Sequence, residues 1–293
     1  MYDLIIRNGL IYDGKGSEPF EADIAISEDK IVSIGNIEED SIETIDAKGK
    51  IVTPGFVDIH THYDGQVTWD PYLRPSTYHG VTTVVMGNCG VGFSPCKPDQ
   101  RDWLIGLMEG VEDIPGTALH EGIDWEWESF PEYLDALEKK PLAIDVGTQI
   151  PHGAVRAYVM GERGINHEEA SEDEINKMKE IVREAVEAGA YGFSTSRTEK
   201  HNDVNGKLTP SITAHKTELV EIAKSLGEID KGVLQGISDF YDFESEFDIF
   251  KSMSKESGRP ISITVEQQDA RPDWWIRLLD GIEDAQSEGI QMF

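Results

Sequence analysis

The sequence is poor in cysteine, in basic residues and in long apolar runs. Cys89 and Cys96 are the only cysteines among 293 residues, too few for a disulfide framework. Lys and Arg number 26 against 56 Asp and Glu, and the formal charge of −30 disfavours nucleic acid and anionic membranes as partners. No apolar run approaches the ~20 residues of a membrane span. The N-terminus also lacks a signal-peptide pattern, so we expect a cytoplasmic protein.

The chain divides into two regions by its hydrophobic pattern. Residues 1–50 read as short strands separated by turns such as Asn8-Gly9 and Asp13-Gly14, which predicts a small N-terminal β unit, half of a small β-sandwich. From residue 51 onward, apolar strands alternate with amphipathic helices, a rhythm typical of parallel βα units. Strands are predicted at residues 51–59, 81–87, 143–149, 191–194, 232–236 and 261–265, with a seventh beginning at 289–293.

Helices are predicted between these strands from capping signals and apolar periodicity. Ser171 and Glu174 form a capping-box pattern, and Gly189 is placed to end the helix that follows. Further helices are expected after Thr213, over 244–258 and after Pro272, whereas residues 97–141 look less regular and resemble an insertion.

The fold class predicted by this pattern is α/β, with a (β/α)8 TIM-type barrel over residues 51–293. Closure of such a barrel needs eight strands, and this chain supplies fewer than seven, so we expect a barrel truncated before its eighth strand. Unpaired strand edges and apolar helix faces would then be exposed. We therefore expect poor solubility, and a homo-oligomer is left open.

Two histidines follow the first barrel strand at a spacing that suits a metal ion. Residues i and i+2 of a strand point the same way, so His60 and His62 present two imidazoles to one side. They lie at the carboxyl end of the strand, the end at which barrel enzymes place their chemistry. The alternative is that hydrogen bonds at a strand end satisfy both rings.

Cys89, in the segment Met86-Gly87-Asn88-Cys89-Gly90, follows the second barrel strand and faces the same end. A thiolate is a normal zinc ligand, and the flanking glycines indicate a close approach of the backbone to another group. A buried, inert thiol is the alternative. Cys96 lies in a loop beside Pro95, and we expect no metal binding there.

The N-acyl-D-amino-acid deacylases, or D-aminoacylases, of the amidohydrolase superfamily resemble this chain over essentially its whole length. The resemblance rests on GFVDIHTHYDGQVTWDPYLRPSTYHGVTTVVMGNCGVGFSP, on PHGAVR at 151–156 and on EAGAYGFSTSR at 187–197. The opening DLIIRNGLIYDG and IVTPGFVDIHTH are shared with hydantoinases and dihydroorotases, so they indicate fold rather than substrate. The resemblance implies zinc-dependent cleavage of an N-acyl-D-amino acid, a small-molecule substrate, into a D-amino acid and a carboxylate.

The resemblance also assigns roles to residues. It implies that His60, His62 and Cys89 bind one or two Zn²⁺ ions, with metal-bound hydroxide as the attacking group. The general-base aspartate is expected beyond residue 293. Relatives with a complete site offer histidines after the fifth and sixth strands, where this chain reads GVLQGIS and ISITVEQQ, so Glu266 is considered as a replacement oxygen ligand.

Other polar residues follow the third and fourth strands. His152, Arg156 and Arg197 are candidates for substrate binding, since a guanidinium can grip a carboxylate through two parallel hydrogen bonds. The alternative for each arginine is pairing with one of the many acidic residues. Asp64 is a candidate to orient the metal-binding histidines.

Two other functions remain open. The first is hydrolysis of a cyclic amide, as in hydantoinases or dihydroorotases, but those enzymes use a carbamylated lysine on the fourth strand, where residues 191–197 contain no lysine. The second is a non-catalytic scaffold or an inactive fragment, since a fold alone does not guarantee activity.

Overall fold

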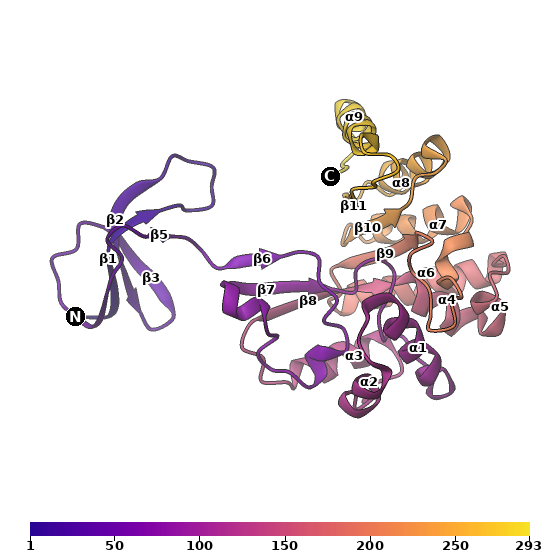
Figure 1. Cartoon of the computed structure of the whole chain (residues 1–293), viewed down its shortest axis with the longest axis horizontal. Coiled ribbons are helices and arrows are strands. Elements are labelled where there is room, and N and C mark those ends of the chain that lie inside the picture. The colour runs from indigo at the N-terminus through magenta and orange to yellow at the C-terminus, as the bar shows by residue number, and fades with distance from the viewer. The chain divides into compact units, whose positions relative to one another are not determined.

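The computed structural model describes all 293 residues and divides them into two compact units, Met1–Phe56 and Val57–Phe293. Each unit has its own sheet (Figure 1). The division falls six residues beyond the boundary predicted at residue 50. No helix is long and apolar enough to cross a bilayer.

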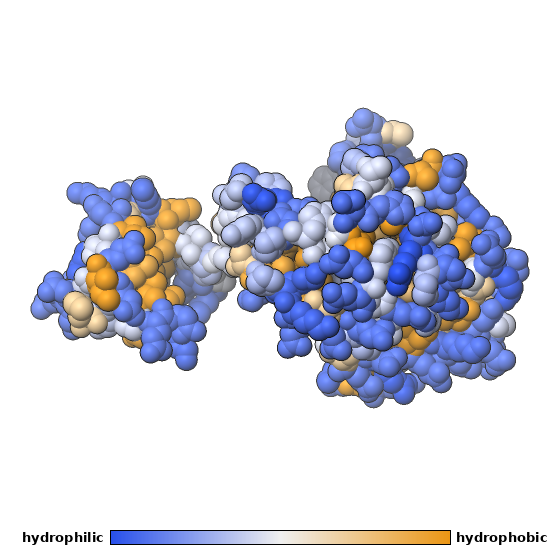
Figure 2. All heavy atoms as spheres, turned by 90° about the horizontal axis from the view of Figure 1, so that it is seen from below, coloured by the Kyte–Doolittle hydropathy of each residue, from blue (hydrophilic) through white to orange (hydrophobic).

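The N-terminal unit is a five-stranded sheet built around its first strand. The strands are β1 (Tyr2–Ile11), β2 (Phe20–Ser27), β3 (Lys30–Gly35), β4 (Ser41–Asp46) and β5 (Ile51–Val52). Strand β1 pairs antiparallel with β2 and parallel with β4 and β5, and β3 completes the sheet beside β2. Ile5, Ala25 and Ile37 form a small core cluster in this unit, and Ile11, Ile24 and Ala47 are also buried. Much of the sheet's apolar surface is therefore exposed, including Ile31 and Ile42, and Figure 2 shows hydrophobic residues gathered on this unit.

The prediction of one continuous strand over residues 51–59 is wrong. The structure splits it into β5, which pairs with β1, and β6 (Phe56–Asp58), which joins the second sheet. Pro54 and Gly55 lie between the two. Proline has no N–H group to donate to a ladder, so the strand is interrupted there.

The second unit contains a curled sheet of six parallel strands in the order of the sequence, which confirms the predicted α/β class. Its strands are β6 (Phe56–Asp58), β7 (Val81–Met86), β8 (Asp145–Pro151), β9 (Gly192–Arg197), β10 (Val233–Ser238) and β11 (Ile261–Thr264). β6 and β11 lie at opposite edges, so the sheet is a half-barrel. Met292 makes a parallel bridge to Ile261, where the seventh strand was expected to begin.

Helices cover the outer face of this sheet, and several neighbouring helices pack against one another, most extensively α6 with α7 and α7 with α8 (Figure 1). Ser171 and Glu174 form the predicted capping box at the start of α6, and Gly189 caps its end. Residues 97–141 are more regular than expected, with three α-helices. The helices are α1 (Arg101–Glu112), α2 (Gly116–Gly122), α3 (Phe130–Glu138), α4 (His152–Met160), α5 (Glu162–Ile165), α6 (Glu172–Ala188), α7 (Lys216–Glu228), α8 (Phe243–Ser257) and α9 (Trp274–Ser287).

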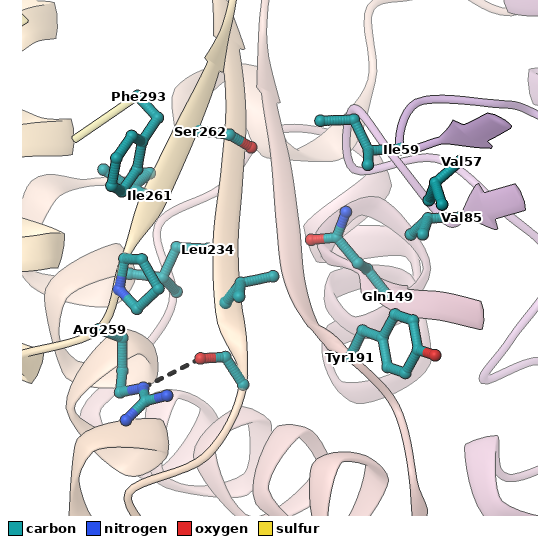
Figure 3. A pocket seen from close by; sticks show the side chains of 13 residues that line it. Val57, Ile59, Val85, Gln149, Tyr191, Leu234, Arg259, Ile261, Ser262 and Phe293 are labelled. Atoms are coloured by element: carbon teal, nitrogen blue, oxygen red, sulfur yellow. Dashed lines mark hydrogen bonds between the residues drawn. The ribbon is translucent and has the colours of Figure 1, made fainter. Parts of the chain in front are cut away.

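A cavity of about 600 Å³ occupies the concave side of the half-barrel (Figure 3). Its walls are mainly apolar and include Val85, Leu234 and Ile261. Gly232 and Pro260, which also line it, precede β10 and β11, so the cavity reaches the amino ends of these strands. This cavity is the hollow of an open barrel. His60, His62 and Cys89 lie at the other end of the sheet, beyond the carboxyl ends of β6 and β7.

Candidate metal centre

His60 and His62 directly follow β6, and the backbone between them is fixed to the neighbouring strand. Thr61 donates both its amide N–H and its hydroxyl to the carbonyl of Val85 in β7, at 2.9 and 2.8 Å. The two imidazole rings lie 5.4 Å apart between centroids, at 60° to each other. The two rings therefore lie close together, as expected, although both residues lie beyond the end of β6 rather than within a strand.

Cys89 is held in a left-handed backbone conformation just after β7, with a φ of 54°. Gly87 and Gly90 flank it, and both also have positive φ. A Cβ at Gly87 would lie 2.0 Å from the carbonyl oxygen of Gln149, and one at Gly90 would lie 2.7 Å from the Ser196 nitrogen. Only glycine fits these two positions, so the expected close backbone approach is confirmed.

The three side chains form a cluster with the donor set of a zinc site. Ligand atoms of His60, His62 and Cys89 all lie within 4.8 Å of one another, and Nε2 of His60 is 3.1 Å from Sγ of Cys89. Two imidazoles and a thiolate are three protein ligands, the number that catalytic zinc sites use with a fourth position open. Nδ1 of His62 is buried without a hydrogen-bonding partner. This set of three donors fits a metal ion.

Burial sets the protonation of the cluster in the absence of a cation. It lowers the pKa of His62 to about 3, with a further lowering by His60 and His201, and lowers the pKa of His60. It also raises the pKa of the Cys89 thiol to about 12. Both imidazoles are therefore neutral at pH 7 and ready to donate lone pairs, whereas Cys89 must lose a proton when a metal binds.

Two neutral polar side chains on the far strands connect to this cluster. Oε1 of Gln235, in β10, accepts the amide N–H of Cys89 at 2.6 Å, and its Nε2 donates to Oγ1 of Thr264, in β11, at 2.9 Å. That hydroxyl lies 3.4 Å from Nδ1 of His60. These contacts form a closed ring of Cys89, Gln235, Thr264 and His60, which connects β10 and β11 with the ends of β6 and β7. Gln235 and Thr264 were not expected at the site from the sequence, although each is a polar residue in a partly apolar strand.

An acidic side chain from the insertion approaches His62. Oε1 of Glu112, the last residue of α1, lies 3.2 Å from Nδ1 of His62, without the geometry of a hydrogen bond. Burial, with Asp64 and Asp113 nearby, raises the pKa of Glu112 to about 7. Because the pKa of His62 is lowered, this contact joins two groups that are uncharged in mildly acidic solution. No pattern in the sequence around Glu112 indicated this contact.

Asp64 and Glu266 do not join the cluster. Asp64 is buried, its Oδ2 has no partner, and no hydrogen bond joins it to either histidine. Burial raises the pKa of its carboxyl to about 7. Glu266 instead pairs with Lys200 at 2.5 Å, and both side chains are more than 40% exposed.

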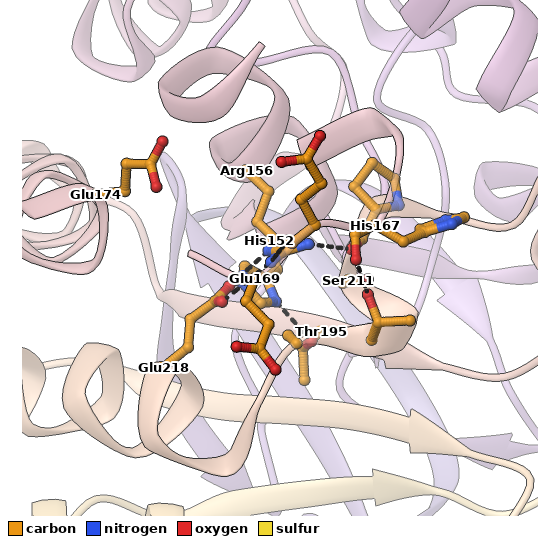
Figure 4. A network of polar contacts seen from close by, with 12 residues as sticks. His152, Arg156, His167, Glu169, Glu174, Thr195, Ser211 and Glu218 are labelled. Carbon is orange, nitrogen blue, oxygen red and sulfur yellow. Dashed lines mark hydrogen bonds and ion pairs between the residues drawn. The ribbon is translucent and has the colours of Figure 1, made fainter. Parts of the chain in front are cut away.

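The three residues considered for substrate binding have internal partners. His152 and Arg156 are fully buried, and both contact the carboxylate of Glu218, at 2.8 and 2.7 Å (Figure 4). Arg197 forms two hydrogen bonds with Glu246, at 2.6 and 2.8 Å. Their charges are neutralised within the protein, so the pairing alternative describes both arginines in this structure.

Comparison with known proteins agrees with the fold. The model of a family described as "Amidohydrolase family" matches residues 43–293, a range that contains all three donors. The chain belongs to the amidohydrolase family. Within this family it is 31% identical over 226 residues to the D-aminoacylase of Alcaligenes xylosoxydans xylosoxydans, covering 77% of this chain and 42% of that protein.

Solved structures of this amidohydrolase group share the fold over the whole chain. A D-aminoacylase variant in complex with CuCl2 superposes with a TM-score of 0.81 at 26% identity, covering 100% of this chain and 57% of that one. The N-acyl-D-glutamate deacylase of Bordetella bronchiseptica, complexed with zinc and a phosphonate inhibitor, gives 0.76 at 25%, covering 99% and 57%. The L-hydantoinase of Arthrobacter aurescens, at 0.56 and 17%, shares the fold alone. The chain thus spans little more than half the length of these structures.

Proposed function

We propose that this chain carries the metal site of a zinc-dependent amidohydrolase that cleaves N-acyl-D-amino acids. The observation that carries the proposal is the convergence of His60, His62 and Cys89 at the carboxyl ends of neighbouring strands. A bound zinc ion would supply Lewis acidity to the amide carbonyl and to a water molecule. The similarity to D-aminoacylases and N-acyl-D-amino-acid deacylases supports this choice of substrate.

The residues of this chain would bind the metal and hold its ligands in place. His60 and His62 donate lone pairs as neutral imidazoles, and Cys89 gives up its thiol proton to become the third ligand. The backbone N–H of Cys89 stays fixed by Gln235, which limits movement of the sulfur. Neither Gln235 nor Thr264 is an imidazole or a carboxylate, and Glu266 is paired elsewhere, so these strands favour one ion over two.

Cyclic amides are less well supported as substrates. Strand β9 contains no lysine that could become a carbamylated bridging ligand, and the hydantoinase structures are far more distant than the D-aminoacylases. No feature of the site specifically favours a non-catalytic scaffold over the enzyme.

The proposal is tested by adding N-acetyl-D-amino acids and their L-enantiomers to the zinc-loaded protein, expressed from its complete coding sequence. Release of free amino acid is measured, with hydantoin and dihydroorotate as cyclic comparisons. We expect turnover of a D-substrate, lost in His60→Ala and retained in His79→Ala, a variant of a histidine outside the cluster. Turnover of the cyclic amides alone, or of no amide by zinc-loaded protein, would contradict the proposal.

A further inference from the structure

The insertion between β7 and β8 places one carboxylate beside the metal cluster. Helix α1 ends at Glu112, and its Oε1 lies 3.2 Å from Nδ1 of His62. Both side chains are 19% exposed. Glu112 forms no ion pair with any lysine or arginine and makes no hydrogen bond with another side chain. In a protein with so many acids, a half-buried carboxylate whose nearest partner is a metal-ligand histidine calls for an explanation.

The position of this carboxylate determines which nitrogen of His62 is available to a metal. Nδ1 faces Glu112, so Nε2 is the nitrogen left to act as a ligand. A neutral imidazole that binds through Nε2 carries its proton on Nδ1, and this proton needs an acceptor. Nδ1 is buried and makes no hydrogen bond in this structure. The oxygen of Glu112 is the acceptor within reach.

The helix that carries Glu112 is firmly held. Leu104, Leu107 and Met108 of α1 are buried in the main core. Val204 donates its amide N–H to the carbonyl of Gly106 at 3.1 Å, and a Cβ at Gly110 would lie 2.3 Å from the carbonyl oxygen of Asn202. A carboxylate at the end of such a helix can hold a fixed position beside the ring, which is the requirement for orienting a ligand.

We propose that Glu112 is the positioning residue of the metal centre. It accepts the Nδ1 proton of His62, fixes the tautomer that leaves Nε2 free, and holds the ring toward the cluster. Asp64, two residues from His62, forms no ion pair with either histidine, whereas the Glu112 oxygen lies 3.2 Å from His62 Nδ1, so Asp64 does not fill this role. The inference rests on the proposed metal site and adds to it a residue supplied by the insertion.

The test compares the zinc affinity of the 293-residue chain with that of three variants, measured by competition with a chromophoric chelator. Glu112→Ala removes the acceptor, and Glu112→Gln keeps an oxygen of similar position without the charge. Asp113→Asn is the matched control, because it removes one acidic charge from the exposed neighbouring residue. Asp113 has a φ of 56°, a conformation that asparagine also adopts readily.

We expect Glu112→Ala to weaken zinc binding by about 10- to 100-fold, the usual effect of removing an outer partner of a ligand histidine. Glu112→Gln should show a smaller loss, and Asp113→Asn should bind like the wild type. Urea unfolding of the metal-free proteins separates this role from a purely structural one. A positioning residue changes metal affinity in Glu112→Gln while leaving the unfolding midpoint of the metal-free protein nearly unchanged.

The outcomes distinguish the two proposals. Zinc binding by the wild type with unchanged affinity in both Glu112 variants would overturn the positioning role and leave the metal site intact. Equal losses in Asp113→Asn and Glu112→Gln would also overturn it, since they would reflect general charge alone. A wild-type chain that binds no zinc would overturn the proposed function, and the role of Glu112 with it.

Discussion

Nε2 of His60 lies 3.1 Å from Sγ of Cys89, although the two residues follow different strands and are 29 positions apart in the sequence. This contact predicts that the two side chains bind one metal ion together. Cys89→Ser should weaken zinc binding by roughly 100-fold or more, since losing a ligand should cost at least as much as losing its outer partner. It should also abolish the thiolate-to-metal charge-transfer band of the cobalt form.

Cys96 provides the matched control for this prediction. It is the other cysteine of the chain and is also buried, but its Sγ contacts the carbonyl of Lys97 and lies outside the metal cluster. Cys96→Ser should retain both zinc affinity and the cobalt band. Loss of the band in Cys96→Ser with its retention in Cys89→Ser would reverse the assignment.

Gln235 should stabilise the fold through its bond to the backbone of Cys89. Gln235→Ala leaves this buried N–H without its acceptor, and we expect a loss of about 1–3 kcal/mol in the free energy of unfolding. Gln291, which is exposed, is a comparison site at which alanine should have little effect. Urea unfolding measures both variants, and equal stability of Gln235→Ala and the wild type would show that the contact contributes nothing.

The buried contacts of Glu218 with His152 and Arg156 predict a dependence of stability on acid. These partners hold the pKa of Glu218 below its ordinary 4.5 despite burial, which acts in the opposite direction. The carboxylate therefore stabilises the fold above about pH 4.5, and this contribution is lost as the pH falls through the lower folded pKa.

Glu218→Gln should remove that contribution and leave the charge of Arg156 buried without its partner. We expect a destabilisation of about 3–5 kcal/mol at pH 7, which shrinks toward pH 3. Glu221→Gln on the same helix is the control, because its partners Lys179 and Lys224 are partly exposed and the expected loss is at most about 1 kcal/mol. Urea unfolding between pH 3 and 7 measures both variants. Equal losses in the free energy of unfolding across this range would contradict the stabilising role of Glu218.

The raised pKa of Asp64 predicts the opposite dependence of stability on pH. Burial raises its pKa from the ordinary 3.8 to about 7, although a hydrogen bond from the amide of Gly87 acts against the shift. Because the folded state binds this proton more tightly than the unfolded state, the free energy of unfolding falls as the pH rises from 3.8 to about 7. In metal-free protein, Asp64→Asn should therefore be more stable than the wild type at pH 8. Thermal unfolding with EDTA would refute this if the variant melted at a lower temperature at pH 8.

Sequence reasoning predicted the parts of the fold and site that depend on local pattern. The HxH spacing after a strand and the glycines beside Cys89 were enough to name the three donors together, although both histidines lie just beyond β6. The βα rhythm likewise predicted six parallel strands. These features follow from strand geometry and from the shared edge at which parallel strands end.

The contacts that local pattern could not predict join residues far apart in the chain. Glu112 reaches His62 because α1 folds back from the insertion, and Gln235 reaches Cys89 across 146 positions. Arg156 looked available for a carboxylate substrate, but Glu218, 62 residues away, pairs with it inside the core. Such pairings depend on how helices and strands pack in three dimensions, and no short spacing in the sequence records them.

The most direct test of the metal site is an anomalous difference map, recorded at the zinc edge from crystals of the zinc-loaded chain. We expect one strong peak per chain, with His60 and His62 nitrogens at about 2.0–2.1 Å and the Cys89 sulfur at about 2.3 Å from it. The refined coordinates should place Nε2 of His62, rather than Nδ1, next to the zinc ion. Crystals that contain zinc but show no anomalous peak among these three side chains would contradict the proposed metal site.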